Sequence, residues 1–432
     1  MMPHPIPTSS GTSRLMHVVV VNDHLYPDGG ADIVALTSAE ALTRLGVKVT
    51  FFAGDRQRAD DGLLRPYAVS CTGQMDLAND PNRLRVAAQG LWNPRAANSL
   101  RKLLSGFDPA TTIVHVHSWT KSLSSSVFRA ASEAGFQVVC TLHDYFSVCP
   151  NGMLFNAQKA QLCEFRPLSL ACIASHCDAR SYTHKLYRVA RHSVQQHIGR
   201  LPNHVDQFIT ISDLSEAVNR RFLPGDSHYA KVRNPIDIGA QPPPADPAAS
   251  RNFVMVARMF APKGWELFLQ ACERAGVQAV AVGDGPDRAA LEQAHPRAKF
   301  LGQLGREGVI AAMRSARALV MPSLWYETQG LVICEAAAQG VPAIVVDTCG
   351  GAENLQAETS GLLFRSGSVD ELAAAIRRLA DDDDLARRLG LAAAQNFWFD
   401  PPTPMTHARD LLVVYSQVLA RVAAVPQGSE QC

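Results

Sequence analysis

Short apolar runs alternate with amphipathic helical stretches along most of the chain. In the first half, apolar runs occupy residues 15–21, 48–54, 113–119, 137–145 and 207–212, with helical patterns at 33–46 and 123–134. Apolar runs of this length between polar turns predict buried strands. Because strands and helices alternate, the pattern predicts a parallel sheet with right-handed crossovers, and hence an α/β domain.

The same alternation restarts in the second half. Apolar runs at 252–258, 277–285, 299–304, 318–323 and 342–347 predict strands, and periodic patterns at 264–275, 306–317, 330–340 and 368–380 predict helices. A Pro- and Ala-rich segment without periodicity, residues 238–250, separates the two sets and predicts a linker. The chain is therefore expected to hold two successive α/β units.

The expected boundaries follow from this pattern. We expect one Rossmann-like domain over residues 16–237 and a second over 251–400, joined by the linker at 238–250. Residues 401–425 contain three prolines and then a helical pattern at 406–422. Residues 1–15 lack the apolar segment of a secretory signal, and we expect a disordered lead-in there.

Composition excludes several classes of protein. Hydrophobic residues make up 47% and charged residues 19%, which suits a chain with a sizeable core. The formal net charge of +1 does not favour binding to nucleic acid, and ten cysteines are too few for a disulfide scaffold. The chain contains no run of about 18 apolar residues, so the sequence predicts no membrane span. We expect a cytoplasmic protein in a reducing compartment.

Candidate ligand-binding residues lie where strands end, because open α/β sheets bind ligands at the carboxyl ends of their strands. Gly29 and Gly30 follow the first strand and precede a helix, where backbone amides attract anions. Arg258 and Lys263 flank the loop after the first strand of the second half, and two cations there suit a diphosphate. Tight turns and solvated surface charges are the alternative interpretations.

Two further strand ends carry candidate residues. Gly283 and Gly285 lie in GDGPD, where small residues leave room for a ligand or form a turn. Glu327 lies in a loop at a strand end, and Glu335 lies in an apolar helix that Gly330 opens. Carboxylates accept hydrogen bonds from sugar hydroxyls, and an unpaired carboxylate among Ala and Cys is costly without a partner.

The two glutamates carry a resemblance to a known family. Seven residues separate Glu327 from Glu335, which resembles the E-x7-E motif of retaining GT-B glycosyltransferases. The segment PSLWYETQGLVICEAAAQGVPAIVVDTCGG and, in chain order, DGG, TLHDYFSVCPNG, FITIS, VRNPID, VARMFAPKG and GDGP resemble glycosyltransferase family 4. The resemblance covers about residues 16–422 and implies two Rossmann-like domains that face each other across a cleft.

The resemblance also implies roles in holding the donor. Arg258 and Lys263 would bind the diphosphate, Glu335 the ribose, and Glu327 the donor-sugar hydroxyls. Backbone amides would assist the sugar-binding carboxylate, from Gln329, Gly330 and Leu331. Many family members have Phe where Gln329 stands, and we link this difference to donor choice.

In the first domain, the resemblance places Gly29 and Gly30 near the phosphates or the donor sugar. His143 matches the histidine that lies beside the reacting sugar in relatives. The family's final helix crosses back onto the first domain, so residues 406–422 are expected to do the same.

The implied reaction retains the donor's anomeric configuration. The departing diphosphate oxygen would accept the acceptor's proton while Arg258 and Lys263 stabilise its charge, so no catalytic metal is expected. The run DDDD at 381–384 lies between two helical stretches, and we interpret it as a helix N-terminus. The expected acceptor is a glycan, growing on a lipid carrier for cell-surface polysaccharide. Alternatives are a nucleotide-sugar epimerase or hydrolase, a sucrose- or trehalose-type synthase on a soluble acceptor, or a non-catalytic nucleotide-sugar-binding protein.

A cysteine-bearing insertion is expected at residues 149–177. Four of the ten cysteines fall there: Cys149, Cys163, Cys172 and Cys177. Their spacing differs from that of a paired CxxC zinc ribbon. Similar insertions in relatives imply a structural Zn(Cys)4 site, and reduced thiols packed in a loop are the alternative.

Residues 179–205 contain Arg180, Lys185, Arg188, Arg191 and Arg200, several histidines and no acidic residue. Helical spacing of their apolar residues predicts a basic amphipathic helix, which either docks on anionic lipid at the inner face of the cytoplasmic membrane or has an ordinary solvated face. Lys185, Arg188 and Arg191 would form the docking face. His115 and His117 are expected to face opposite sides of a strand, with one of them in the core.

Overall fold

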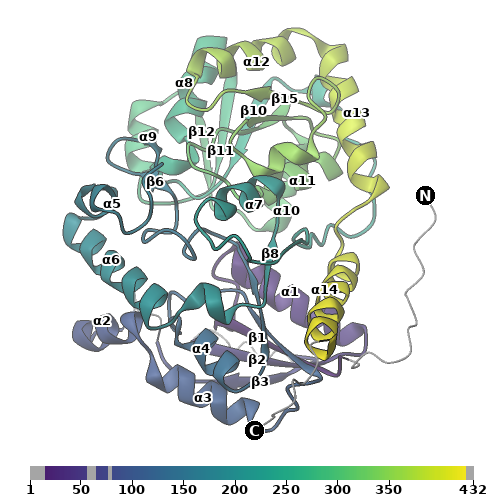
Figure 1. Cartoon of the computed structure of the whole chain (residues 1–432). Coiled ribbons are helices and arrows are strands. Elements are labelled where there is room, and N and C mark those ends of the chain that lie inside the picture. The colour runs from purple at the N-terminus through teal and green to yellow at the C-terminus, as the bar shows by residue number, and fades with distance from the viewer. Residues whose placement is uncertain (1–14, 56–64, 76–79, 425–432) are drawn as a thin grey trace, which may run out of the picture.

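The computed structural model describes residues 15–55, 65–75 and 80–424. The lead-in expected at residues 1–15 lies almost wholly outside the described residues, as does residue 425. Two stacked α/β domains make up the described chain, with the first sheet low and the second high in Figure 1. No helix within the described ranges is both long and apolar enough to cross a membrane.

The first domain is built on a seven-stranded parallel sheet. Its strand order is β3-β2-β1-β4-β5-β8-β9. The strands are β1 (His17–His24), β2 (Lys48–Asp55), β3 (Ala68–Cys71), β4 (Thr112–Val116), β5 (Gln137–Thr141), β8 (Gln207–Thr210) and β9 (Tyr229–Lys231). The central strand β1 is a run of valines buried on both faces, as parallel sheets require.

The helices of the first domain cover both faces of this sheet. They are α1 (Gly30–Arg44), α2 (Arg83–Leu91), α3 (Pro94–Leu104), α4 (Ser126–Glu133), α5 (Leu170–Ala174), α6 (Tyr182–His197) and α7 (Asp213–Arg220). Two short strands, β6 (Phe155–Asn156) and β7 (Gln161–Leu162), pair in the cysteine-bearing insertion. Side chains of α3 and α4 pack on one face of the sheet and those of α1 on the other.

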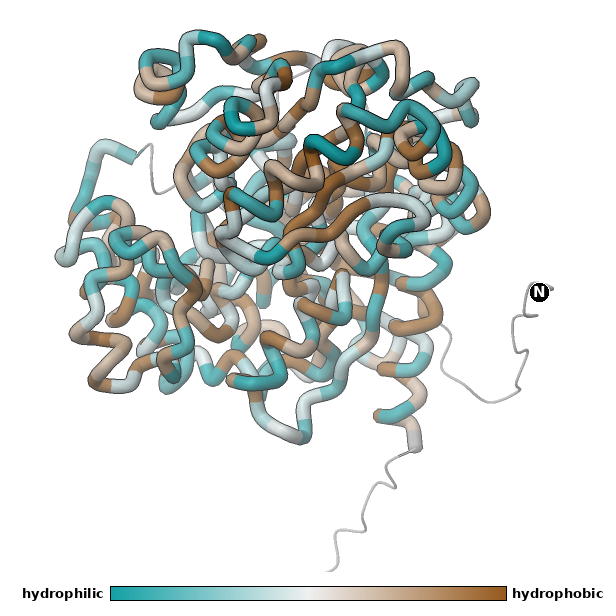
Figure 2. The backbone as a smooth tube through the Cα atoms, turned by 90° about the horizontal axis from the view of Figure 1, so that it is seen from above, coloured by the Kyte–Doolittle hydropathy of each residue, from teal (hydrophilic) through white to brown (hydrophobic). Residues whose placement is uncertain are grey.

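The second domain has a six-stranded parallel sheet in the order β12-β11-β10-β13-β14-β15. Its strands are β10 (Asn252–Val256), β11 (Gln278–Val282), β12 (Lys299–Gly302), β13 (Ala318–Met321), β14 (Ala343–Val346) and β15 (Gly361–Phe364). Its helices are α8 (Trp265–Ala275), α9 (Arg288–Ala294), α10 (Arg306–Arg314), α11 (Leu331–Ala338), α12 (Val369–Asp381) and α13 (Asp383–Phe399). Figure 2 shows segments of hydrophobic residues in the interior of this domain, enclosed by helices that contain both hydrophobic and hydrophilic residues.

The last helix, α14 (Pro404–Ala424), returns from the second domain to the first (Figure 1). Its buried side chains, among them Leu411, Tyr415 and Val418, join the core beneath α1. Tyr415 Oη also lies 2.6 Å from His115 Nδ1 in that core. The C-terminal segment therefore completes the hydrophobic core of the N-terminal domain.

The aspartate run at 381–384 has a structural role. Asp382 lies between α12 and α13, and its side chain accepts a hydrogen bond of 2.8 Å from the backbone amide of Leu385. This is the helix N-cap that the sequence predicts. Asp383 forms an ion pair of 2.7 Å with the buried Arg317.

The expectation that His115 and His117 face opposite sides is wrong. Their ring centroids lie 4.1 Å apart, and both rings are buried. Residues two apart along a strand point to the same face, because side chains alternate at every residue. His117 therefore extends the line of His115 toward the carboxyl edge of the sheet.

The predicted amphipathic orientation of α6 is also wrong. Lys185 is 1% exposed, whereas Leu186 and Ile198 are 42% and 47% exposed. Arg188 pairs with the buried Asp178 at 3.1 Å, and Arg191 lies over the ring of Phe146. The helix turns its basic side inward because the insertion and the loop after β5 offer sulfur, carboxylate and aromatic partners. These three basic side chains do not form a solvent-facing docking surface.

Candidate active site

The strand orders of the two sheets define where ligands are expected. In each sheet the order reverses between the first strand and the fourth, at β1/β4 and at β10/β13. Loops after these strand pairs diverge to opposite faces and leave a crevice at the carboxyl edge. Three of these loops, those after β1, β10 and β13, contain candidate residues: Gly29, Arg258, Lys263, Glu327, Gln329 and Gly330.

Lys263 and Glu327 meet at the switch point of the second sheet. Lys263 follows β10 and Glu327 follows β13, and Lys263 Nζ lies 2.6 Å from Glu327 Oε2. The same oxygen accepts hydrogen bonds from Ser323 Oγ at 3.1 Å and from Trp325 Nε1 at 3.0 Å. The other oxygen, Oε1, has no hydrogen-bond partner among the described residues. One half of the carboxylate is thus held by the protein, and the other half is available to a ligand.

Gly264 allows the Lys263 loop to approach the Glu327 loop. Its φ is +79°, and a Cβ built there would collide with the carbonyl oxygen of Pro322. Any other residue would therefore force apart the two loops that carry Lys263 and Glu327. The backbone, and not only the ion pair, holds these side chains together.

Arg258 lies in the loop after β10, with its side chain exposed. Its backbone carbonyl accepts a hydrogen bond of 3.0 Å from Trp265 Nε1, which fixes the loop. Gly283 and Gly285 press against the backbone of Ala257 and Met259, where a Cβ would collide. These glycines let the loop after β11 pack closely on the Arg258 loop. Packing therefore explains the glycines, in addition to the room for a ligand that the sequence predicts.

Glu335 lies on α11, four residues after Leu331 at the start of that helix, and is partly buried. It has no hydrogen bond or ion pair to another described residue. Burial raises the pKa of its carboxyl group, and the positive charge of Arg306 opposes this only in part. A partly buried carboxylate without a partner is the situation in which a ligand hydroxyl stabilises the charged form.

Gly29 and Gly30 lie at the N-terminus of α1, and a Cβ at Gly30 would meet nothing within 4 Å. Packing within the protein therefore does not require glycine at position 30. Close approach of a ligand, as predicted from the sequence, is the remaining explanation. Across the β1/β4 switch point, Lys121 Nζ pairs with Asp28 at 2.8 Å. Asp23 accepts backbone hydrogen bonds from Lys121 and Ser122 at 2.9 and 2.8 Å, which ties the two loops together.

His143 follows β5 and lies beside His117, with His143 Nε2 and His117 Nδ1 3.0 Å apart. Burial lowers the pKa of His143 to about 4, although the charge of Asp32 opposes the shift. At neutral pH the imidazole is uncharged, so it can donate or accept a hydrogen bond but does not repel or attract as a cation. Burial also raises the pKa of the neighbouring Asp144 to about 6.

Direct contacts bring the loops of the two domains together. Thr328, next to Glu327, donates a hydrogen bond of 3.0 Å from Oγ1 to the backbone carbonyl of His143. Ser212 Oγ donates to the Thr328 carbonyl at 2.6 Å. The carboxylate of Glu353 accepts from the backbone amides of Asp213 and Leu214 at the start of α7, at 2.9 and 2.7 Å. Thr328 therefore joins the predicted donor-sugar carboxylate to the predicted sugar-flanking histidine.

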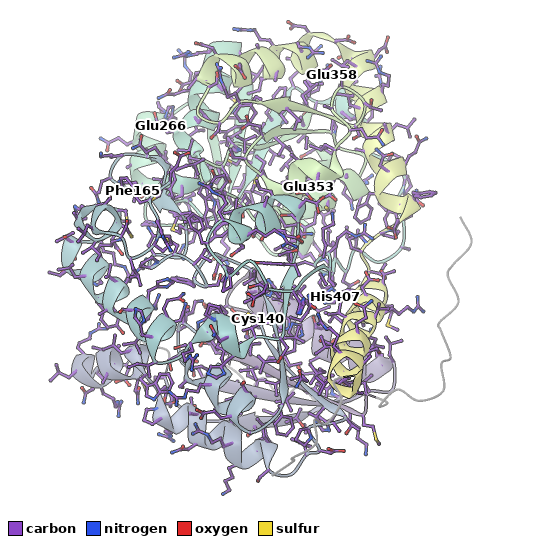
Figure 3. The ribbon with its side chains drawn as sticks, in the orientation of Figure 1. Cys140, Phe165, Glu266, Glu353, Glu358 and His407 are labelled. Carbon is purple, nitrogen blue, oxygen red and sulfur yellow. The ribbon has the colours of Figure 1, made fainter. Side chains whose placement is uncertain are left out.

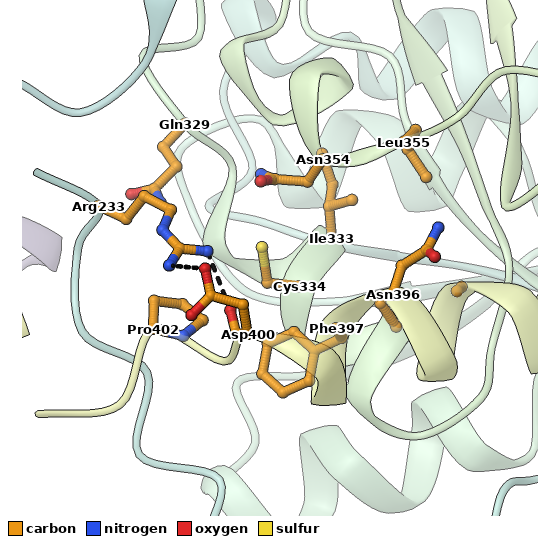
Figure 4. Close-up of a pocket in the computed structure, with 12 residues that line it drawn as sticks. Arg233, Gln329, Ile333, Cys334, Asn354, Leu355, Asn396, Phe397, Asp400 and Pro402 are labelled. Carbon is orange, nitrogen blue, oxygen red and sulfur yellow. Dashed lines mark hydrogen bonds and ion pairs between the residues drawn. The ribbon is translucent and has the colours of Figure 1, made fainter. Parts of the chain in front are cut away.

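The side chain of Gln329 lies beside a cavity that Glu327 does not line. It lines a cavity of about 70 Å³ with Arg233, Cys334 and Asp400 (Figure 4). We call the segments around Arg233 and Asp400, where the chain passes between the two domains, the hinge. Arg233 pairs with Asp400 at 2.7 Å, and the buried Gln329 Oε1 has no hydrogen-bond partner in the part of the chain that the structure describes. A role of Gln329 in donor choice would therefore act through its backbone or through the hinge.

Several residues of this site were not predicted from the sequence. Ser323, Trp325, Thr328, His117 and Lys121 carry no motif of their own and acquire a role only from their neighbours. His117 was the one with a usable signal, since a residue two positions after His115 on the same strand must share its face.

In the described ranges, one group of three potential metal ligands has its ligand atoms within 4.8 Å of one another: His24, Asp28 and Asp32. Asp28 and Asp32 are already bound by Lys121 and Asn22, so this group does not stand open.

Comparison with known proteins agrees with this geometry. The family model described as "Glycosyl transferase 4-like domain" matches residues 29–215, and the model "Glycosyl transferases group 1" matches residues 250–382. Glycogen synthase of Mycobacterium tuberculosis is 30% identical over 212 residues, which are 45% of this chain and 50% of that protein. The match with this curated relative thus spans about half of its length.

Solved structures share the whole fold. Sucrose-phosphate synthase from Thermosynechococcus elongatus superposes with a TM-score of 0.71 at 20% identity, covering 94% of this chain and 100% of that one. HepE from Anabaena, in complex with UDP, gives a TM-score of 0.63 at 18% identity, covering 93% and 100%. These likenesses establish the GT-B arrangement of two Rossmann-like domains. Since the two family models together match most of the chain, one in each domain, the chain belongs to the GT-B glycosyltransferases.

Proposed function

We propose that this protein is a retaining glycosyltransferase that moves a sugar from a nucleoside diphosphate sugar to a hydroxyl group of a glycan. The observation that carries the proposal is the divided environment of Glu327. One carboxylate oxygen is held by Lys263, Ser323 and Trp325, and the other is free to accept from a sugar hydroxyl. An oriented acceptor of this kind, next to a cation, suits a sugar attached to a diphosphate.

The proposed mechanism uses charge stabilisation at the leaving group. As the bond between sugar and diphosphate breaks, negative charge grows on the diphosphate, and Arg258 and Lys263 stabilise it. The departing phosphate oxygen accepts the proton of the attacking hydroxyl on the same face of the sugar, so the configuration is retained. The neutral His143 contributes a hydrogen bond and not a charge. No metal ion is required in this scheme, so turnover is expected to persist in EDTA.

Thermal unfolding in the presence of UDP-, GDP- and ADP-sugars tests donor binding, because a ligand that binds the native state raises the melting temperature. The cognate donor should raise it and should release free nucleotide when an acceptor is added. No shift with any nucleoside diphosphate sugar, together with no nucleotide release, would contradict the proposal. Dependence of turnover on an added divalent cation would contradict its metal-free mechanism.

The acceptor that we propose is a glycan growing on a lipid carrier at the cytoplasmic face of the membrane. Support comes from exposed leucines on α2, α5 and α6, of which α6 contacts the other two helices: Leu84 and Leu170 are each 86% exposed and Leu186 is 42% exposed. Arg83 and Arg180 are exposed on the same elements or directly beside them, which suits anionic lipid.

Flotation with anionic liposomes tests this surface. Leu84→Glu combined with Leu186→Glu should weaken binding to the liposomes, since each change places a charge where apolar contact is proposed. Val413→Glu is a matched control, because this exposed side chain lies on α14, on a different part of the surface. Equal flotation of both variants and the unaltered protein would contradict membrane docking through this surface.

A soluble acceptor is the second candidate, favoured by the likeness to sucrose-phosphate synthase and by the match to glycogen synthase. The two candidates differ in what accelerates nucleotide release. A lipid-linked glycan should do so in the first case, and a free sugar, sugar phosphate or soluble glucan in the second.

Glu335→Gln should weaken donor binding and yet not destabilise the protein. A charge-assisted hydrogen bond to the ribose contributes about 1.5–3 kcal/mol, so the donor Kd should rise on the order of 10- to 100-fold. Because folding raises the pKa of Glu335, the free energy of unfolding of the unaltered protein falls as pH rises from the unfolded to the folded pKa. The Gln variant lacks this fall. Its free energy of unfolding, measured by denaturant titration relative to that of the unaltered protein, should therefore increase from acidic to neutral pH. Unchanged donor affinity would contradict the ribose assignment.

A further inference from the structure

Three histidines lie in a row from the core of the first domain to the carboxyl edge of its sheet. His115 lies on β4, His117 directly follows this strand, and His143 follows β5. The ring centroids of His115 and His117 lie 4.1 Å apart, and those of His117 and His143 lie 5.3 Å apart with an interplanar angle of 20°. His117 is 2% exposed, and the proposed transfer mechanism does not use it. The row places this buried side chain directly behind the histidine of the candidate site.

His115 is held at both of its ring nitrogens. Its Nδ1 lies 2.6 Å from Tyr415 Oη of α14, and its Nε2 lies 2.7 Å from Thr141 Oγ1 of β5. All three side chains are buried. The orientation of His115 is therefore fixed by the core, and its ring forms a fixed wall against which His117 packs.

His117 has one polar side-chain contact. Its Nδ1 lies 3.0 Å from His143 Nε2, and its own Nε2 is buried without a hydrogen-bond partner in the part of the chain that the structure describes. Burial lowers the pKa of His117 well below its usual value and the pKa of His143 to about 4, so both rings are uncharged at neutral pH. A neutral imidazole carries one ring hydrogen. A single hydrogen therefore lies between the two rings, on His117 Nδ1 or on His143 Nε2.

The buried Nε2 of His117 distinguishes these two arrangements. If His143 Nε2 carried the shared hydrogen, the hydrogen of His117 would be on Nε2, as a buried N–H group without an acceptor. If His117 Nδ1 carries the shared hydrogen, His117 Nε2 is instead an acceptor with an unused lone pair. Buried N–H groups without an acceptor are rarer in proteins than acceptors with an unused lone pair. The second arrangement is therefore favoured, and it places the hydrogen of His143 on Nδ1.

We propose that His117 is a positioning residue, which donates a hydrogen bond from Nδ1 to His143 Nε2 and so fixes His143 as a hydrogen-bond donor at Nδ1. Nδ1 of His143 has no hydrogen-bond partner among the described residues, and its side chain is only partly buried. The backbone carbonyl of His143 accepts a hydrogen bond from Thr328 Oγ1 at 3.0 Å, so both the backbone and the ring are held. A fixed, uncharged N–H donor suits an oxygen atom of a sugar.

Nuclear magnetic resonance of the full-length protein with ¹⁵N-labelled histidines tests the position of the hydrogen. At neutral pH, the two-bond couplings between the carbon-bound ring protons and the ring nitrogens distinguish a hydrogen on Nδ1 from one on Nε2. His117 and His143 should both carry it on Nδ1, with their signals assigned by loss in His117→Asn and in His143→Gln. A hydrogen mainly on Nε2 of His143, or a doubly protonated ring in either residue, would overturn the proposal.

Two substitutions of His117 test whether it positions His143. His117→Leu removes the donor, so His143 should populate both tautomers, and kcat/KM should fall about 2- to 10-fold, as expected for loss of one neutral hydrogen bond. His117→Asn places an amide N–H close to the former Nδ1, because both nitrogens are bonded to Cγ. This variant should therefore keep the hydrogen of His143 on Nδ1 and retain most of the rate. An unchanged tautomer of His143 in His117→Leu would show that His117 does not position it.

His17→Asn is the matched control. His17 lies at the start of β1, at the amino end of the same sheet, and its Nε2 lies 2.9 Å from Thr50 Oγ1. This variant should leave the His143 signals and kcat/KM unchanged, and a fall in kcat/KM equal to that of His117→Leu would contradict the positioning role.

The position of the hydrogen depends on contacts of the first domain, whereas its effect on the rate rests on the proposed function. A shifted tautomer in His117→Leu with unchanged kcat/KM would overturn the effect on turnover. Absence of nucleotide release by the unaltered protein would contradict the proposed function alone, because the position of the hydrogen is measured without substrate.

Discussion

Replacing Glu327 by Ala is expected to abolish sugar transfer and to leave the protein folded. The change removes the acceptor for the donor-sugar hydroxyls and also the partner that holds Lys263 at 2.6 Å. Loss of a preorganised charged group of this kind lowers kcat on the order of 10²–10³-fold or more. Because Glu327 lies in a loop and outside the hydrophobic core, the cooperative thermal transition should remain.

Glu327→Gln and a surface variant sharpen this test. Gln keeps the size and one acceptor but removes the charge, so it should retain little activity if the carboxylate is required. Glu358→Gln is the matched control, because Glu358 also forms an ion pair, at 2.7 Å with Arg378, but lies at the far end of the second domain (Figure 3). Rates of product formation measured at saturating donor should be normal for Glu358→Gln. Normal turnover in Glu327→Ala would remove the basis of the proposed site.

Replacing Lys263 by Gln is expected to have the second-largest effect, and it should fall on kcat more than on KM. The ammonium group interacts with a diphosphate in both ground and transition states, but negative charge grows only as the sugar leaves. An effect on the order of 10²-fold in kcat follows for loss of one such group. Arg258→Gln should act in the same direction, and the double variant should lose less than the product of the single effects if both stabilise one charge.

The leaving group provides a direct check of this role. A donor with a better leaving group needs less stabilisation, so an activated sugar donor should partly restore the rate of Lys263→Gln and not that of Glu327→Ala. Arg378→Gln, which breaks the exposed pair with Glu358, serves as the charge-matched control and should behave like the unaltered protein. If Lys263→Gln raised KM alone, the lysine would be a binding group and not a stabiliser of the leaving group.

The outcome for α6 shows where periodicity misleads. Tyr187, Ala190, Val194 and Ile198 follow helical spacing, which predicts an inward apolar face and an outward basic one. In the structure, Lys185, His192 and Gln195 are buried instead. Gln195 Nε2 donates to the carbonyl of Phe146 at 2.9 Å, and Lys185 reaches the cysteines. The polar partners that reverse the helix come from segments remote in sequence, and no local pattern contains them.

Periodicity along the chain predicted two α/β domains, and the spacing of Glu327 and Glu335 predicted a glycosyltransferase motif. Strand and helix periodicities and short motifs are both formed by residues close together in the chain, so they can be recognised without the fold. Which residues meet became visible only in the folded chain: Lys263 contacts Glu327 across 64 positions, Thr328 contacts the His143 carbonyl across 185, and Lys185 contacts Cys172. The folded chain also shows that α14 completes the first domain's core. These contacts depend on how two sheets and their loops pack, and packing between distant segments leaves no periodic signal in the chain.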